Sequence, residues 1–260
     1  MRRRESWLWG LAGLPALLFI LVPLAALAGH TTAEELRHSL APPETLKAIL
    51  LSSRTTILSL VVVVILGLPL AYFSARWKSR LSPLIDAIAD LPIVLPPAAA
   101  GIALLAAFGR MGWIGGPLYS LGVQITFTTT AVVIAQVFVS LPYFVRSAAE
   151  GIRAVASEEI SAASLDGAGS LRIAWSVILP QCRSALLAGT LLAWARSLGE
   201  FGATLMFAGN FVGRTQTIPL AIYAGFEGDL SQAVALSIVL LVLAILVLFV
   251  ARVVARNERR

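Results

Sequence analysis

Long apolar runs alternate with short polar segments along the whole chain. Six mostly apolar runs stand out, at positions 7–27, 56–73, 84–108, 128–145, 185–207 and 230–254. A helix needs about 20 such residues to cross a hydrocarbon core about 30 Å thick. The pattern therefore predicts an all-α, polytopic membrane protein with about six transmembrane helices.

Prolines interrupt two of these runs. Pro92, Pro96 and Pro97 lie in the third run, and Pro142 lies in the fourth. Prolines inside spans are tolerated where the freed backbone groups face protein or a water-filled cavity rather than lipid. We therefore expect the third span, around Pro96 and Pro97, to line a path through the protein.

The composition agrees with a membrane protein, and the basic residues indicate its orientation. The chain is 58% hydrophobic and 13% charged, with a mean hydropathy of +0.86. When the six runs are threaded through a bilayer, one side carries Arg2, Arg3, Arg4, Arg76, Lys78, Arg80, Arg146, Arg153, Arg172, Arg183, Arg252, Arg256, Arg259 and Arg260. The other side carries only Arg37, Lys47, Arg54, Arg110 and Arg214. Since an excess of Lys and Arg marks the cytoplasmic side, we expect both termini to be cytoplasmic. The net charge of +6 is then a topology signal, and no nucleic-acid partner is expected.

The first run has a second interpretation, as a cleaved signal peptide. Arg2, Arg3 and Arg4 precede it, and it ends in a plausible cleavage site at residues 26–28. Its apolar part, about 20 residues, exceeds the usual 7 to 15 of such peptides, so we expect residues 1–28 to be retained. Beyond it, Thr32 and Glu35 have the spacing of a capping box, which predicts a short helix over residues 33–40.

Few side chains are suited to catalysis or to metal binding. Cys182 is the only cysteine, and the two histidines, His30 and His38, lie eight residues apart without a carboxylate cluster beside them. A G-x-x-x-x-G-K-[ST] phosphate-binding loop is absent, so the chain should not hydrolyse ATP unaided. We expect no catalytic residue, no metal site and no cofactor.

A polar module between the fourth and fifth runs is the most informative part of the sequence. Glycines at 167 and 169 divide it into two helical patterns. Upstream, the apolar positions with helical spacing are Ile152, Val155, Ala156, Ile160 and Ala163, which predict one amphipathic helix over residues 150–165. Downstream, Ser170 is placed to N-cap a second helix with apolar residues Leu171, Ala174, Trp175 and Ile178, and Pro180 is placed to end it.

The same module resembles the EAA loop of the membrane subunits of bacterial and archaeal ABC importers. The matching pattern is Ala162-Ala163-x₃-Gly167-x₉-Val177-x-Leu179-Pro180, with Ser161 in place of the usual first Glu and Val177 in place of the usual Ile. We call residues 147–183 the EAA-type loop. The resemblance implies the fold of a type I importer permease, a single transmembrane permease domain over residues 1–260, and a short helix that fits a cleft on a separate ATPase subunit. The residues implied to couple to that ATPase are Ala162, Ala163, Asp166, Gly167, Leu171, Trp175, Leu179 and Pro180.

A second resemblance narrows the branch of the family. Residues 195–204, which read Ala-Arg-Ser-Leu-Gly-Glu-Phe-Gly-Ala-Thr, are similar to the molybdate permease branch, as are residues 208–210 and 213–220. The related sulfate and thiosulfate permeases tend to carry Tyr where this chain has Phe201. The resemblance implies a molybdate or tungstate cargo, a homodimer, an ATPase pair and an external oxyanion-binding protein as partners. A sulfate or thiosulfate permease is the alternative.

Several polar residues are candidates for the path or its gate. Arg196 and Glu200 have i, i+4 spacing, which predicts an ion pair that serves either to fix helix register or to gate. The other candidates are Pro96, Pro97, Thr128 and Thr204. Gly199 and Gly202 predict close helix approach. Asp86 and Asp90 are expected to cap a helix or to pack against the coupling region.

Two other functional classes fit the pattern less well. A secondary transporter usually shows ionisable residues or broken helices in corresponding halves, and here the intramembrane charges reduce to one Arg/Glu pair. An intramembrane enzyme would need a nucleophile, base or metal constellation, which the histidine and cysteine content does not supply.

Overall fold

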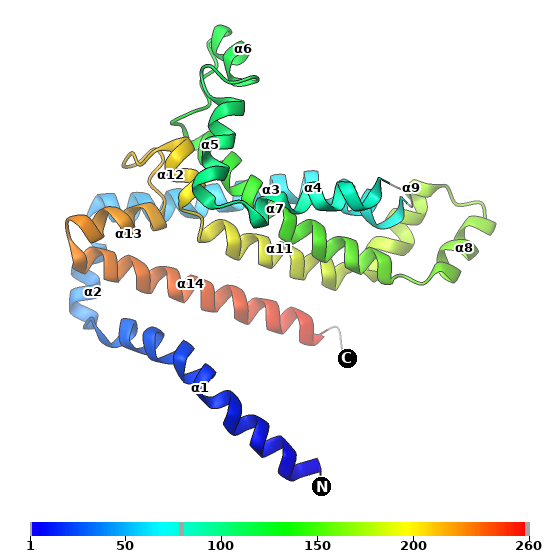
Figure 1. Ribbon diagram of the computed structural model, residues 1–260, viewed down its shortest axis with the longest axis horizontal. Helices are drawn as coiled ribbons and strands as arrows, with labels where there is room; N and C mark the ends of the chain where they lie inside the picture. The colour runs from blue at the N-terminus through cyan, green and yellow to red at the C-terminus, as the bar shows by residue number, and fades with distance from the viewer. Residues whose placement is uncertain (1, 78–80, 258–260) are drawn as a thin grey trace.

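The computed structural model describes residues 2–77 and 81–257, and no β-strand occurs among them. Most helices run alongside one another in a bundle, from which two short helices project (Figure 1). The all-α class is confirmed. Four residues of the charge argument, Lys78, Arg80, Arg259 and Arg260, lie outside the described ranges.

Four described helices are long and apolar enough to cross a membrane. They contain the stretches Leu11–Gly29, Pro43–Arg76, Thr129–Ala154 and Leu230–Val250. In full these helices are α1 (Arg2–Gly29), α3 (Pro43–Arg76), α7 (Thr129–Ala154) and α14 (Leu230–Asn257). Two bent helix pairs, Ser82–Val94 with Pro97–Phe108 and Ser170–Gln181 with Arg183–Leu198, can each count as one further span, which gives up to six. The predicted number agrees with this upper count, although the second pair includes residues 170–181, which the sequence places outside the spans.

The predicted third and fifth spans are not straight helices, which corrects the sequence prediction. The third divides into α4 (Ser82–Val94) and α5 (Pro97–Phe108), bent by 114°. The stretch 185–207 divides into α11 (Arg183–Leu198) and α12 (Gly202–Ala208). Prolines explain the first break, and Gly199 lies at the second.

Helix α7 forms the centre of the bundle. In its apolar stretch 61% of the residues are buried, against 28% for α3 and 22% for α14. One hydrophobic core joins α7 to α3 and α11 through Val63, Phe144 and Ala193. A second core joins α7 to α5 and α12, and a third joins α3 to α13 (Ile218–Glu227) and α14. Helix α13 was not anticipated from the sequence.

Short helices lie at the end of the bundle opposite the EAA-type loop (Figure 1). Helix α2 (Ala33–Leu40) begins with the predicted capping box, in which Thr32 and Glu35 exchange backbone and side-chain hydrogen bonds. These bonds lower the pKa of the Glu35 carboxyl, the backbone N–H of Thr32 contributing most. Helix α13 is tied to α3 because the Ser52 hydroxyl accepts a hydrogen bond of 2.7 Å from the N–H of Ile218.

Two parts of the chain extend away from the long helices of the bundle. Helix α1 diverges from it, with none of its stretch Leu11–Gly29 buried (Figure 1). Helices α5 and α6 (Gly115–Ser120) project sideways from the bundle.

Candidate functional site

The EAA-type loop lies at one end of the bundle and consists of two short helical segments joined by a glycine turn (Figure 1). The predicted continuous helix over residues 150–165 is wrong: α7 ends at Ala154, and Val155 and Ala156 are extended before α8 (Ser157–Leu165) begins. The acidic residues Glu158 and Glu159 lie in the first turn of α8, where the helix dipole favours negative charge. The apolar periodicity continues across this break because residues on both sides pack against the same core.

Gly167 makes the predicted turn. Its φ is +80°, in the left-handed region that favours glycine. The N–H of Gly167 donates to the carbonyl of Ser164, and the N–H of Ala168 donates to the carbonyl of Ala163. These two bonds form a Schellman motif, which ends α8 and satisfies its last carbonyl groups.

The second segment is one helical stretch, Ser170–Gln181, that differs from the prediction at both ends. It contains α9 (Ser170–Ile173), a π-helical turn (Ala174–Ile178) and α10 (Leu179–Gln181). Gly169, not Ser170, occupies the N-cap, and no side chain caps the helix.

Pro180 lies inside the last turn of this stretch and does not end it. The chain turns two residues later, at the buried Cys182, and bends by 75° into α11. A proline in a helix clashes with the carbonyl four residues earlier, that of Ser176. We attribute the wider π-helical turn to this clash.

The stretch Ser170–Gln181, which we call the short helix, has one face on the bundle and one face outward. Ile173 and Ile178 are buried, whereas the side chains of Leu171 and Trp175 are 77% and 68% exposed. The predicted apolar stripe is therefore divided between the two faces. Of the other residues predicted to couple to an ATPase, Ala162, Asp166, Gly167 and Pro180 are exposed, and Ala163 and Leu179 are half-buried. Exposed large apolar side chains gathered on one surface are typical of protein contacts.

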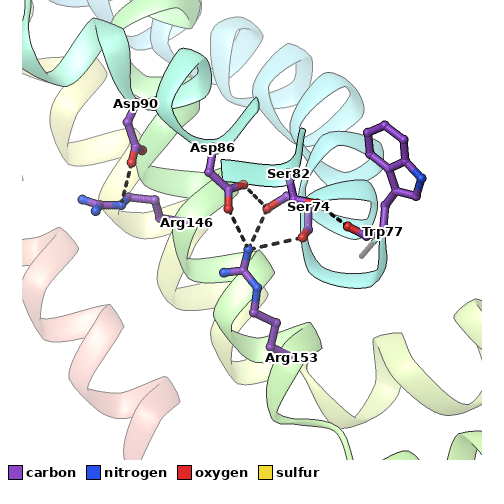
Figure 2. Close-up of polar contacts among 7 residues, drawn as sticks. All are labelled: Ser74, Trp77, Ser82, Asp86, Asp90, Arg146 and Arg153. Atoms are coloured by element: carbon purple, nitrogen blue, oxygen red, sulfur yellow. Dashed lines mark hydrogen bonds and ion pairs between the residues drawn. The ribbon is translucent and has the colours of Figure 1, made fainter. Parts of the chain in front are cut away.

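Beside this loop, two ion pairs fasten α4 to α7 (Figure 2). Arg153 lies 3.2 Å from Asp86 and also donates to the carbonyl and hydroxyl oxygens of Ser74 on α3, at 3.3 and 2.8 Å. Arg146 lies 3.4 Å from Asp90. Asp86 and Asp90 therefore pack against the coupling region, one of the two roles expected for them, and neither caps α4.

Sequence reasoning missed the two arginines of this junction, which it treated only as topology signals. The available signal was spacing. Asp86 and Asp90 lie four residues apart on one helix, and Arg146 and Arg153 lie seven apart on another. Both spacings place the side chains on a single helix face.

The break in the third span falls at the consecutive prolines. Leu95 and Pro96 are each followed by a proline and have extended backbones, with ψ of 130° and 137°. Proline disfavours the helical conformation of the residue before it, so two in succession stop α4. Pro97 then begins α5 at a position where its missing N–H costs nothing. Pro92, by contrast, stays inside α4.

In the second break, Glu200 joins the end of α11 to the start of α12. One carboxylate oxygen lies 2.7 Å from the guanidinium of Arg196, and the other accepts a hydrogen bond of 2.8 Å from the N–H of Ala203. The Glu200 side chain is 1% exposed and that of Arg196 is 26% exposed. The predicted pair exists, although Glu200 lies beyond the helix end rather than on the same helix face.

The two breaks contact each other. A Cβ on Gly202 would lie 2.7 Å from Cβ of Pro97, and one on Gly101 would lie 2.8 Å from the carbonyl oxygen of Ala203. No side chain larger than hydrogen fits at either glycine without movement, so the prediction of close approach is confirmed for Gly202. It is wrong for Gly199, whose nearest such atom is 3.9 Å away.

The remaining path candidates differ in their hydrogen bonding. The Thr128 hydroxyl caps α7, accepting from the N–H of Ala131 and donating to the carbonyl of Ile125. The hydroxyl of Thr204 is fully buried, and within the described chain it has no hydrogen-bond partner, as is also true of Ser197 and Thr217. Among the described residues, no group of three or more His, Cys, Asp or Glu side chains is placed to hold a metal ion.

Comparison with known proteins identifies the family. The model of the "Binding-protein-dependent transport system inner membrane component" family matches residues 64–260. The chain belongs to this family. The matched region of this inner membrane transport component begins within α3 and includes the EAA-type loop and both breaks.

Individual relatives are similar to this member of the family over most of its length. The molybdenum transport system permease protein ModB of Mycobacterium tuberculosis is 44% identical, over 93% of this chain and 91% of its own. The probable transport system permease protein NifC of Clostridium pasteurianum is 36% identical, over 94% and 87%. The sulfate transport system permease protein CysW of Synechococcus elongatus is 32% identical, over 84% and 79%.

Solved structures support the fold of a type I ABC importer permease. A chain of a bacterial alginate ABC transporter, solved with an alginate-bound periplasmic protein, superposes with a TM-score of 0.75. The superposition covers 98% of this chain and 96% of that one, at 15% sequence identity. At such low identity the likeness concerns the fold alone.

Proposed function

We propose that this chain is the permease subunit of an ATP-driven importer that carries a tetrahedral oxyanion, molybdate or its near-isosteric analogue tungstate, into the cell. Membership of the transport family and 44% identity to a molybdenum permease, against 32% to a sulfate permease, support this cargo. Phe201, at a position where sulfate permeases tend to carry Tyr, agrees with it. The chain is one permease domain of a bacterial or archaeal plasma membrane.

The proposed coupling to an ATPase rests on the outward apolar face of the EAA-type loop. Leu171 and Trp175 are exposed at the end of the bundle, next to a turn fixed by Gly167. We infer that this face docks into a separate ATPase, because the chain has no phosphate-binding loop of its own. Both termini and this loop are then cytoplasmic, as the distribution of basic residues predicts.

When the ATPase closes, its movement can be transmitted to the path through a series of contacts within the chain. The loop continues into α7, α7 holds α4 through Arg146 and Arg153, and α4 leads to the break at Pro97. That break contacts the second one at Gly202. The path itself is proposed to form between two copies of the chain, and an external binding protein delivers the anion.

Transport by reconstituted vesicles tests this function. Vesicles that contain the permease, its ATPase and its binding protein should accumulate molybdate only when ATP is present on the ATPase side. Uptake should persist when proton and sodium gradients are collapsed. Uptake by the permease alone, driven by either gradient, would instead identify a secondary transporter. A strong preference for sulfate over molybdate would keep the mechanism and change the cargo.

A further inference from the structure

A pocket opens at the end of the bundle opposite the EAA-type loop, where α13 and the first turns of α3 and α14 meet (Figure 1). Its volume is about 350 Å³. We call it the polar pocket. Its lining combines the polar residues Glu44, Thr45, Gln216, Asp229 and Gln232 with the small or apolar residues Val212, Ala221, Ala224, Gly225 and Gly228.

The charges of α14 place the polar pocket at a surface of the bilayer. No charged residue lies between Asp229 and Arg252. These two residues are 23 positions apart, which at 1.5 Å per residue is about 34 Å along the helix and close to the thickness of a hydrocarbon core. Asp229 is therefore at headgroup level or beyond it. A protein in the aqueous phase on this side can reach the exposed rim at Asp229 and Glu44.

The wall of the polar pocket contains an amide group that is ready to bind a ligand. Gln216 is only 8% exposed, and within the described chain its side chain makes no hydrogen bond. Its neighbour Gln232 is satisfied, because its amide donates to the Thr45 hydroxyl at 2.6 Å. A buried amide without a partner is costly, so an occupant that forms hydrogen bonds with Gln216 is favoured.

Two carboxylates give the polar pocket a negative charge. One oxygen of Asp229 accepts from the N–H groups of Ser231 and Gln232 at 3.0 and 3.3 Å, which caps α14. In the described part of the chain neither Asp229 nor Glu44 forms an ion pair, and no Lys or Arg lines the pocket. Such a pocket repels an oxyanion and attracts a cation.

The apolar part of the lining indicates what kind of cation fits. Val212, Ala221 and Ala224 offer the pocket no side-chain ligand for a bare metal ion. They do suit the methylene stem of a long basic side chain, which packs on apolar surface while its charged end reaches polar groups. A guanidinium or ammonium group also donates hydrogen bonds, which the oxygen atoms of Gln216 and of both carboxylates can accept.

We propose that the polar pocket receives an arginine or lysine side chain of the external binding protein. The stem lies along Val212 and Ala224, and the charged end lies between Glu44 and Asp229 and donates to Gln216. The inference rests on the proposed function, which places a partner protein at this end of the bundle. A second copy of the chain and a metal ion are the competing occupants.

Binding measurements on the complete transporter test the pocket. The permease and its ATPase are placed together in nanodiscs and titrated with the molybdate-loaded binding protein. Glu44→Gln and Asp229→Asn should each raise the Kd by about tenfold, because each removes one charge that faces the basic side chain. Asparagine at 229 can still cap α14, so this variant should fold normally.

Two further variants separate entry into the pocket from general electrostatics. Glu34→Gln removes the same charge from an exposed position at the same end of the bundle, outside the pocket lining, and should leave the Kd unchanged. Gly228→Leu changes no charge. A Cβ on Gly228 would meet no atom closer than 3.6 Å, so leucine is tolerated there. It should weaken binding by narrowing the pocket.

The outcomes distinguish this site from the proposed function itself. An unchanged Kd in both Glu44→Gln and Asp229→Asn, or an equal rise in Glu34→Gln, would overturn the site and leave the importer assignment intact. A wild-type complex that does not bind the binding protein at all would contradict the importer assignment and the site with it. Dissociation of permease dimers in Asp229→Asn, seen by native mass spectrometry, would assign the pocket to a second copy. Loss of wild-type binding with EDTA, reversed by Ca²⁺, would assign it to a metal ion.

Charge reversal can identify the basic side chain. Asp229→Lys should abolish binding of the wild-type binding protein. Among binding-protein variants in which single surface Arg or Lys residues are changed to Glu, one should bind Asp229→Lys more tightly than it binds the wild-type permease. A panel in which no variant regains affinity would contradict direct pairing at Asp229.

Discussion

Arginine–carboxylate pairs occur in two regions of this molecule, and their surroundings differ. In the break between α11 and α12, Glu200 is buried and bridges Arg196 to the N–H of Ala203. At the junction of α4 with α7, Asp86 and Asp90 pair with Arg153 and Arg146 while all four side chains are partly exposed to solvent.

The difference in burial predicts different consequences for the same chemistry. Removing one partner of a buried pair leaves an unpaired charge without water and costs several kcal/mol. Exposed pairs contribute little because water screens them. The buried pair therefore maintains the shape of the break, whereas the exposed pairs can re-form without a large cost when α4 and α7 move.

The largest expected effect follows from breaking the buried pair. Arg196→Met should destabilise the protein by about 3–5 kcal/mol, since Glu200 keeps only the Ala203 N–H as a partner. The double variant with Glu200→Gln should recover much of this loss, because the amide oxygen can still accept from Ala203. Thermal unfolding of the wild type, both single variants and the double variant in detergent provides the cycle. Strict additivity would exclude direct pairing.

The second prediction separates function from stability at the exposed end of the bundle. Trp175→Asp should weaken binding of the partner ATPase by about 30-fold or more, the loss expected when an interface anchor is removed. Its thermal stability should stay near that of the wild type, because the side chain is 68% exposed. Gly167→Glu should also weaken binding, since its φ of +80° disfavours other residues.

A matched control for that prediction is Trp113→Asp. Trp113 is 92% exposed and lies between α5 and α6, away from the EAA-type loop. This variant should bind the ATPase normally in a pull-down. Equal loss in Trp113→Asp and Trp175→Asp, or none in either, would contradict a docking role for the short helix.

The third prediction ranks the two exposed pairs. Arg153→Met and Arg146→Met should each cost no more than about 1 kcal/mol of stability. Arg153→Met should have the larger effect because Arg153 also donates to Ser74 and so joins α4 and α7 to α3. Thermal unfolding of both variants checks the order. A cost for either one equal to that of Arg196→Met would remove the distinction between buried and exposed pairs.

The smallest effect is expected for a contact confined to one helix. Thr32→Ala should raise hydrogen exchange in the first turn of α2 by about fivefold and leave the rest of the bundle unchanged. Since folding lowers the pKa of Glu35, the carboxylate's contribution is present above its ordinary value of 4.5 and is lost as pH falls through the lowered value. Protection of α2, corrected for intrinsic exchange rates, should therefore fall in acid.

Local signals in the sequence predicted local features. The capping box of Thr32 and Glu35, the turn at Gly167 and the pairing of Arg196 with Glu200 each involve residues at most four positions apart. Their geometry is set largely by the backbone between them. The straight spans were found for a similar reason, because each is a long, mostly apolar run.

The partners of most tertiary contacts were not predicted. Pro92 stays within α4 while Pro96 ends its continuation, and counting prolines does not distinguish the two. The pairing of Arg153 with Asp86 depends on how α4 approaches α7, which no local pattern specifies. The same holds for Ile218, whose N–H is satisfied by Ser52 on a distant helix.

The isolation of α1 has a consequence for the order of assembly. No residue of its stretch Leu11–Gly29 is buried, and the helix contacts α14 but not the packed helices α3, α7 and α11, so the packing of those three helices depends little on α1. Helices in a bilayer form individually before they associate, and α1 can remain at that first stage while the later helices pack together. The cooperative unfolding unit of a single chain therefore begins after α1.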